Sequence, residues 1–245
     1  IRYEDGDMVV LNKAPGVTVH PGPGHFYDTV GNFLLWHYDQ EGSEADFHPV
    51  HRLDRGTSGL MVVAKHPHAQ EKLKEQLHTA DFFREYLAVC DGVPPEEAGT
   101  VDAPIGRHPT DRKKMAVVAG GRSAVTHWRV LKRYGYVTLV ECRLETGRTH
   151  QIRVHMSWQG HPLFNDERYG GDRILKGTTF SKYRQFVENC FAVLPRHALH
   201  ARSLGFVHPT TRETVYFESK LPSDFRALLE KWETYAAASK ETDNG

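Results

Sequence analysis

The polar segment HRLDRGTSG, residues 51–59, stands directly before the apolar run LMVVA at residues 60–64. A continuous apolar and β-branched run of this length predicts a strand that is buried on both faces. Asp54 therefore lies at the mouth of a buried strand, where a carboxylate stays ionised only if it is paired or hydrogen-bonded. Two roles stay open for Asp54: a structural ion pair that holds the loop, or a charge retained for chemistry.

A second polar segment, ETGRTHQIRVH at residues 145–155, is typical of a turn that enters a helix. Free backbone N–H groups at such a turn, together with the guanidinium groups of Arg148 and Arg153, can hold an anion such as a phosphate or a carboxylate. A solvated helix start with satisfied arginines is the alternative. Arg153 is a candidate partner for Asp54.

Hydrophobic patterning predicts strands and helices that alternate irregularly along the chain. Strands are expected at residues 8–11, 60–64 and 84–89 and in hairpins at 128–144 and 204–218, and helices at 68–77, at 147–156 and from 222 through 232. Residues 239–245 are expected to form a polar, frayed tail. No repeat or linker divides the chain, so we expect a compact α+β or mixed α/β fold with a largely antiparallel sheet.

Charge and composition limit the compartment and the partners. The 31 Lys and Arg residues balance 31 Asp and Glu residues, so nucleic-acid binding would depend on a local basic surface. The basic residues Arg107, Arg112, Lys113 and Lys114 could follow nucleic-acid phosphates, although a solvated charge run is the simpler interpretation. The three cysteines lack paired spacing and no apolar run could span a bilayer, so we expect a cytoplasmic protein with no membrane partner.

The 16 histidines do not predict a metal site. Metal sites usually add carboxylate or thiolate ligands at set spacings, and the close histidine pairs lack such a set. These pairs are His48 with His51, His150 with His155, and His197 with His200.

Taken together, the polar segments resemble the RluA-type pseudouridine synthases (RluA, RluC and RluD). The matching motifs, in the family's order and spacing, are VVLNKAPG at 9–16, HRLDRGTSG at 51–59, REY at 84–86 and TGRTHQIRVH at 146–155. The resemblance continues through residues 160–163 and 197–201 and covers essentially the whole chain. Within the family the sequence looks closest to the RluD-like branch, through HPG at 20–22 and residues 198–209.

This resemblance implies the pseudouridine synthase fold, with a largely antiparallel mixed sheet in two fused lobes flanked by helices and an active-site cleft between them. It assigns residues 1–238 to the catalytic domain. Many relatives also carry an S4-like RNA-binding domain, and none is expected within this chain.

The resemblance also implies isomerisation of uridine to pseudouridine in structured RNA, without a cofactor or metal. Asp54 is then the catalytic carboxylate, which could add to C6 of uracil, attack C1′, or assist a glycal route. Arg153 would pair with Asp54 and keep it ionised, and Tyr86 would stack against the uracil ring.

A uridine within an RNA stem must leave the stack before it can react. By resemblance, Arg52, two residues before Asp54, fills the space that the flipped base vacates. The expected substrate-binding residues are Arg52, Thr57, Arg148, His150 and Gln151.

Several functional alternatives stay open at this point. Large-subunit (23S) ribosomal RNA is the expected substrate, with transfer RNA as the alternative. DNA is not an expected partner. The chain is expected to be a monomer. A noncatalytic RNA-binding or ribosome-assembly module would retain the scaffold without the reaction. A hydrolase with an aspartate nucleophile would need a second carboxylate as its acid, and these motifs offer none.

Overall fold

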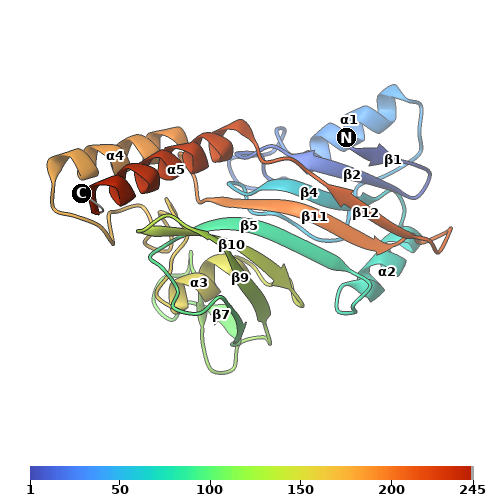
Figure 1. The fold of residues 1–245 in the computed structure, drawn as a ribbon. Helices are drawn as coiled ribbons and strands as arrows, with labels where there is room; N and C mark the ends of the chain where they lie inside the picture. The colour runs from blue at the N-terminus through green and yellow to red at the C-terminus, as the bar shows by residue number, and fades with distance from the viewer. Residues whose placement is uncertain (244–245) are drawn as a thin grey trace. The chain divides into compact units, whose positions relative to one another are not determined.

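A computed structural model describes residues 1–243 of the chain and divides them into two compact units. Unit 1 comprises Ile1–Tyr86, Leu144–Gly147 and His200–Lys220, and unit 2 comprises Leu87–Arg143, Arg148–Leu199 and the chain from Leu221 onward. Strands and helices occur in both units (Figure 1), which confirms the predicted α+β class. The expected cleft between two lobes stays a prediction.

Unit 1 is built around strand β4, Ser58–Ala64, in which every residue is buried. The strand order is β1-β2-β4-β11, with β3 also paired to β4 and β12 to β11. The bounds are Tyr3–Glu4 for β1, Met8–Lys13 for β2, His48–Pro49 for β3, Leu199–Val207 for β11 and Thr214–Glu218 for β12. Strand β4 runs antiparallel to β2 and parallel to β11, so the predicted buried strand is confirmed and is central in this unit.

Two helices of unit 1 begin at local capping signals. Helix α1, Val30–Gln40, starts with a capping box in which Thr29 and Asn32 exchange side-chain and backbone hydrogen bonds. Helix α2, Pro67–Gln76, starts at a proline whose fixed φ suits the first helical position. Its buried residues Ala69 and Leu73 join the apolar core around β4.

Unit 2 combines a strand ladder in the order β10-β9-β6 with three helices. The strands are β6 Ala98–Asp102, β9 Val125–Arg133 and β10 Val137–Leu144, and a separate hairpin pairs β7 Ile105–Arg107 with β8 Met115–Val117. The helices are α3 Gln151–Trp158, α4 Ser181–Val193 and α5 Ser223–Asp243. Helices α4 and α5 lie side by side (Figure 1) and share a core that includes Phe164, Phe225 and Trp232.

Strand β5, Phe83–Asp91, contributes to both units, because the boundary falls between Tyr86 and Leu87. The predicted strand at 84–89 is therefore confirmed. Helix α5 continues to Asp243, past the predicted start of a frayed tail at Ser239, since the preceding alanines favour helix propagation. Residues 244–245 lie outside the described residues. Among the described helices, none has the length and apolar character needed to cross a membrane.

The end of β5 carries a buried carboxyl group that forms no ion pair with any described residue. Asp91 is 6% exposed, and its Oδ2 atom has no hydrogen-bond partner among the described residues. Its backbone is well anchored, since its N–H donates to the Pro162 carbonyl at 2.9 Å and its carbonyl accepts from His161 Nδ1 at 2.8 Å. Burial raises the pKa of Asp91 to about 8.

Replacing Asp91 with asparagine should stabilise the protein in a pH-dependent way. Between about pH 4 and pH 8 the native carboxyl group retains a proton that the unfolded chain has lost, so folding stability falls as pH rises. Asp91→Asn removes this loss and should raise the free energy of unfolding at pH 8 by at least about 1 kcal/mol, with little difference near pH 4. Urea denaturation at both pH values, with the exposed Asp39→Asn as control, tests this. Equal effects of Asp91→Asn at the two pH values would contradict it.

Candidate active site

The loop that carries Asp54 connects β3 to β4 and is anchored to the chain that follows β2. The Gly16 N–H donates to the Arg55 carbonyl at 2.7 Å, and the ammonium group of Lys13 donates to the same oxygen at 3.2 Å. Arg55 Nε returns a hydrogen bond to the Gly16 carbonyl at 2.9 Å. The Thr57 N–H closes a turn on the Asp54 carbonyl at 3.0 Å. The backbone around Asp54 is therefore held by the chain that follows β2 and by a turn within the loop itself.

The start of β4 is held by a buried histidine. His200 Nδ1 lies 2.9 Å from Ser58 Oγ, and its Nε2 lies 2.8 Å from Ser219 Oγ. Gly59 has a φ of +113°, and a Cβ at that position would overlap the carbonyl oxygen of Ala201. Only glycine permits this conformation and this close approach of β4 to β11. These contacts fix the strand end from which the Asp54 loop emerges.

Unit 1 brings Tyr86 into electrostatic range of Asp54. Tyr86 is 6% exposed, and Arg84, two residues earlier on the same side of β5, is 4% exposed. Burial raises the pKa of Tyr86, the positive charge of Arg84 lowers it, and the negative charge of Asp54 raises it. Two of the three predicted catalytic residues are thus positioned by one unit.

The two other predicted site residues of unit 1 differ in exposure. Arg52 is exposed, and its charge acts on His20, whose pKa is lowered first by burial and then by Arg52. Thr57 is buried, at 1% exposure, and supports the loop from within. Arg52 is placed to reach a ligand, whereas Thr57 is better placed to shape the loop. Contact of either residue with RNA stays a prediction.

Arg153 in α3 is held by a carboxylate within unit 2. Its Nε lies 2.7 Å from Asp166 Oδ2 and its Nη2 lies 2.8 Å from Asp166 Oδ1, which makes a bidentate pair. The guanidinium group also lies over the Tyr169 ring, 5.0 Å from its centre. Asp166 Oδ1 additionally accepts from the backbone N–H groups of Arg168 and Tyr169. The plane of the Arg153 guanidinium is therefore fixed before any substrate binds.

Asp166 is a site residue that the sequence analysis missed. It lies 13 residues after Arg153, outside the motifs, and only the folded unit shows the pairing. Asp54, the predicted partner of Arg153, belongs to the other unit. The Asp54–Arg153 ion pair stays a prediction.

The predicted binding residues before and within the first turn of α3 mainly bond to one another and to their own unit. Gln151 is 3% exposed; its Oε1 accepts from the Arg148 N–H at 2.9 Å and its Nε2 donates to Thr126 Oγ1 at 3.0 Å. His150 adopts a left-handed conformation with φ of 58°, and its Nδ1 lies 2.6 Å from the Tyr169 hydroxyl. These bonds shape the turn. Contacts of Arg148, His150 and Gln151 with RNA stay predictions.

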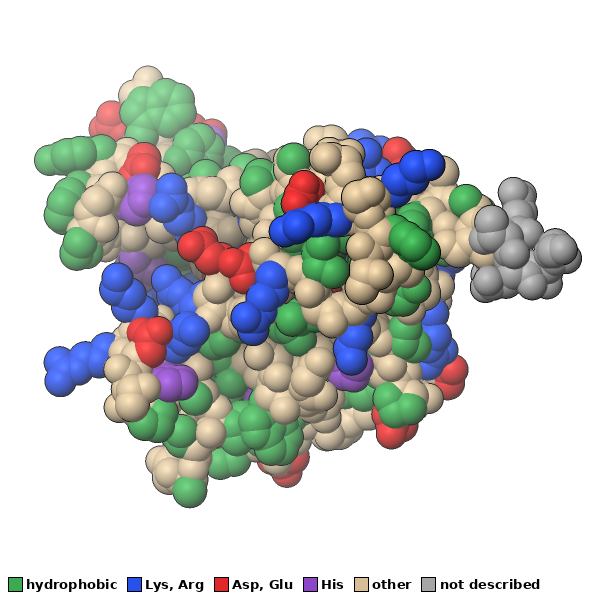
Figure 2. All heavy atoms as spheres, turned by 90° about the vertical axis from the view of Figure 1, so that its left-hand side faces the viewer, with side chains coloured by type: hydrophobic (Ala, Val, Ile, Leu, Met, Phe, Trp, Pro, Cys, Tyr) green, Lys and Arg blue, Asp and Glu red, His purple; other side chains and the backbone are tan. Residues whose placement is uncertain are grey.

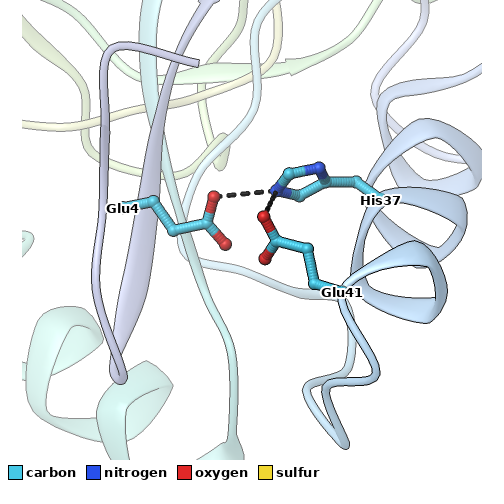
Figure 3. A group of neighbouring side chains, drawn as sticks. All are labelled: Glu4, His37 and Glu41. Carbon is cyan, nitrogen blue, oxygen red and sulfur yellow. Dashed lines mark hydrogen bonds and ion pairs between the residues drawn. The ribbon is translucent and has the colours of Figure 1, made fainter.

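Two groups of side chains in the described chain have a composition that could bind a metal ion. In the first, His37 Nε2 lies 2.8 Å from Glu4 and 3.5 Å from Glu41 (Figure 3). The ammonium group of Lys65 lies 2.6 Å from the other oxygen of Glu4. Burial opposes ionisation of Glu4, but the bonds from Lys65 and His37 outweigh it and lower its pKa. A cation already neutralises this carboxylate, which disfavours a metal ion.

The second group consists of Asp5, Asp7 and His208, and hydrogen bonds already use both ring nitrogens of the histidine. His208 Nε2 lies 2.6 Å from Asp5 Oδ2, and its Nδ1 accepts from the backbone N–H groups of Thr210 and Thr211. An imidazole nitrogen that accepts a backbone hydrogen bond has no lone pair left for a metal. Both groups are best interpreted as structural hydrogen-bond networks.

Sequence comparisons identify the family. The family described as RNA pseudouridylate synthase matches residues 7–158, a span that includes Asp54, Tyr86 and Arg153. The uncharacterized RNA pseudouridine synthase YlyB of Bacillus subtilis is 46% identical over 94% of this chain and 71% of its own length. The ribosomal large subunit pseudouridine synthase D of Pseudomonas aeruginosa is also 46% identical, over 94% of this chain and 70% of its own length.

Solved structures agree with the sequence comparisons. The human RNA pseudouridylate synthase domain containing 4 protein matches with a TM-score of 0.70 and 29% identity, covering 95% of this chain and 92% of that one. Its human relative, domain containing 1, matches with a TM-score of 0.67 and 26% identity, over 92% and 85% of the two chains. The chain belongs to the RluA-type family of RNA pseudouridine synthases and is an isomerase that acts on RNA. The family resemblance and the predicted fold are confirmed.

Asp166→Asn should destabilise unit 2 and lower activity by releasing Arg153. Breaking a buried ion pair leaves an uncompensated charge and costs about 3–5 kcal/mol. The matched control is Asp224→Asn, which breaks the bidentate pair with Arg196 at a more exposed carboxylate. Urea denaturation and turnover per folded molecule should show both losses for Asp166→Asn and only a smaller stability loss for the control. Full turnover by folded Asp166→Asn would show that Asp166 does not position Arg153 for catalysis.

Proposed function

We propose that this enzyme isomerises uridines of large-subunit ribosomal RNA, with Asp54 as the catalytic carboxylate acting on a base flipped out of its stem. The observation that carries the proposal is the placement of Asp54 on an anchored loop, with its charge raising the pKa of the buried Tyr86 side chain. A carboxylate on an anchored loop, within electrostatic reach of a buried aromatic side chain, suits a reaction at the base of one nucleotide.

The reaction is an isomerisation, so every atom of the uridine remains in the product. The N1–C1′ bond breaks, the detached uracil turns, and a C5–C1′ bond forms. The C5 proton then leaves and N1 gains a proton. Asp54 could add to C6, attack C1′ or assist a glycal route, and each of these tasks needs an ionised carboxylate. Tyr86 offers a flat ring that can stack on uracil and keep it in the pocket.

Base flipping explains the exposed arginine beside the catalytic loop. Removing a base from a stem costs a few kcal/mol, roughly, and leaves a gap in the stack. Arg52 is exposed two residues before Asp54. A guanidinium can stack on neighbouring bases and donate hydrogen bonds at the same time, so Arg52 is suited to fill the gap.

The proposal that ribosomal RNA is the substrate rests on the names of similar proteins. Several proteins 44–46% identical to this chain carry the name ribosomal large subunit pseudouridine synthase D. On the face shown in Figure 2, Lys and Arg side chains are interspersed with Asp and Glu, so this face is not uniformly basic. Transfer RNA is the alternative substrate. We further propose that the enzyme is cytoplasmic and monomeric.

Asp54→Asn should abolish turnover while folding and RNA binding persist, because it removes one charge with almost no change in volume. We expect the rate to fall by at least roughly 1,000-fold, as is common when a nucleophile is removed. Tritium release from RNA labelled with [5-³H]uridine measures the reaction directly. The exposed Asp39→Asn should retain the wild-type rate.

The same assay separates the alternatives when ribosomal and transfer RNA are supplied in parallel. Release from ribosomal RNA alone supports the proposed substrate, and release from transfer RNA alone replaces it. Free uracil among the products would identify a hydrolase. Wild-type turnover by Asp54→Asn would refute the assigned role of Asp54.

A further inference from the structure

Arg84 places a buried positive charge beside Tyr86. The alternation along β5 buries Arg84 and Tyr86 on the same side and leaves Phe83 and Glu85 partly exposed. The Arg84 guanidinium carbon lies 5.5 Å from the centre of the Phe82 ring. A Cβ at Gly147 would lie 2.6 Å from Arg84 Nη1, so the guanidinium reaches the glycine of the TGRTHQIRVH motif.

No described carboxylate forms an ion pair with the buried guanidinium of Arg84. Its Nε and Nη2 atoms are buried and have no hydrogen-bond acceptor among the described residues. By contrast, Arg153 and Arg196 each form a bidentate pair with an aspartate. Burial lowers the pKa of Arg84, yet a guanidinium stays protonated at any physiological pH. A buried, unpaired cation is costly, so its presence calls for a compensating role.

The neighbouring histidine does not supply the missing negative charge. His51 Nε2 accepts a hydrogen bond from the Val62 N–H at 3.1 Å, and its Nδ1 is buried without a partner in the described chain. Burial, with the charge of Arg84 as a second cause, lowers the pKa of His51 to about 3. His51 is therefore neutral and presents another N–H donor. His51 therefore offers Arg84 no hydrogen-bond acceptor, because its Nε2 lone pair already accepts from Val62.

Arg84 and the catalytic carboxylate act on the same side chain. The positive charge of Arg84 and the negative charge of Asp54 shift the pKa of the Tyr86 hydroxyl in opposite directions, after the larger effect of burial. A base that stacks on Tyr86 would therefore lie within the field of a cation as well as that of Asp54. Low dielectric strengthens that field.

The proposed reaction places negative charge on the uracil ring by every route left open above. If the N1–C1′ bond breaks first, its electron pair remains on uracil and spreads over N1, O2 and O4. If Asp54 adds to C6, the electrons of the C5–C6 bond move toward C5 and O4. The charge is neutralised when the C5–C1′ bond has formed, C5 has lost its proton and N1 has gained one. Asp54, an anion, cannot stabilise this charge.

We propose that Arg84 is an electrostatic positioning residue whose uncompensated charge, acting past Tyr86, stabilises the negative charge that develops on uracil. The inference rests on the proposed function and adds a named source of stabilisation. A fixed charge in a water-poor site costs no reorganisation during the reaction, and removing one such group typically lowers rates by roughly 100- to 1,000-fold.

The test compares Arg84→Met and Arg84→Lys with the wild-type enzyme on RNA that contains uridine or 5-fluorouridine at the target position. Fluorine withdraws electrons and stabilises a negative charge on the ring without help from the protein. With enzyme in excess, Arg84→Met should convert uridine roughly 100-fold more slowly, with the Kd for RNA within about twofold of wild type. The rate on 5-fluorouridine RNA is measured as the disappearance of 5-fluorouridine from digests of the RNA, and Arg84→Met should lower this rate much less. The rates of Arg84→Lys should lie between those of wild type and Arg84→Met.

The control is Arg202→Met, which removes a partly exposed arginine of unit 1 that pairs with Glu218, and it should leave all rates unchanged. Equal losses on both substrates would overturn the inference in favour of a structural role. A weakened Kd with an unchanged saturating rate would overturn it in favour of a phosphate contact. If Arg84→Met does not fold, the same comparison with Arg84→Lys decides. Wild-type turnover on uridine checks the proposed function separately.

Discussion

The complete burial of β4 is the constraint on which the arrangement of unit 1 depends. Unpaired polar groups are costly at the end of a strand buried on both faces, so the loop before it needs hydrogen bonds from the protein. Gly16 and Lys13 supply these bonds from the β2 side, and His200 supplies them from the β11 side. The same bonds that pair polar groups at the strand end also fix the backbone of the loop that carries Asp54.

Arg84 and Arg153 are buried arginines within the family motifs, and their surroundings differ. Arg153 is neutralised by Asp166 and oriented by Tyr169, which suits a group that must keep one geometry. Among the described residues, Nε and Nη2 of Arg84 have no hydrogen-bond acceptor, which suits a charge whose field must remain available. The carboxylate of an ion pair cancels most of the electrostatic field of its cation, so a paired cation mainly fixes local geometry. An unpaired cation keeps its electrostatic field, and the surrounding core must hold it in place.

Much of the fold could be predicted from local patterns. The apolar run at residues 60–64, the hairpin partners β9 and β10, and helix α2 follow from periodicity and turn residues that act over short distances. Helix α1 is absent from these expectations because Phe33 and Trp36 are exposed and blur its amphipathic pattern. The extension of α5 was missed because a polar sequence was equated with a frayed end, although its alanines favour a helix.

The sequence by itself determined the chemistry that is possible, since Asp54, Tyr86 and Arg153 stand in motifs whose order identifies the family. It also indicated which strand is buried, because a short apolar and β-branched run bounded by polar residues favours a buried strand. Only the tertiary structure decided that Asp166 holds Arg153 and that His200 clamps Ser58. It alone decided that Arg84 is buried with no counterion among the described residues. Ion pairs and hydrogen bonds depend on distance in space. Arg153 and Asp166 are 13 positions apart and Ser58 and His200 are 142 apart, so no local sequence pattern indicates these contacts.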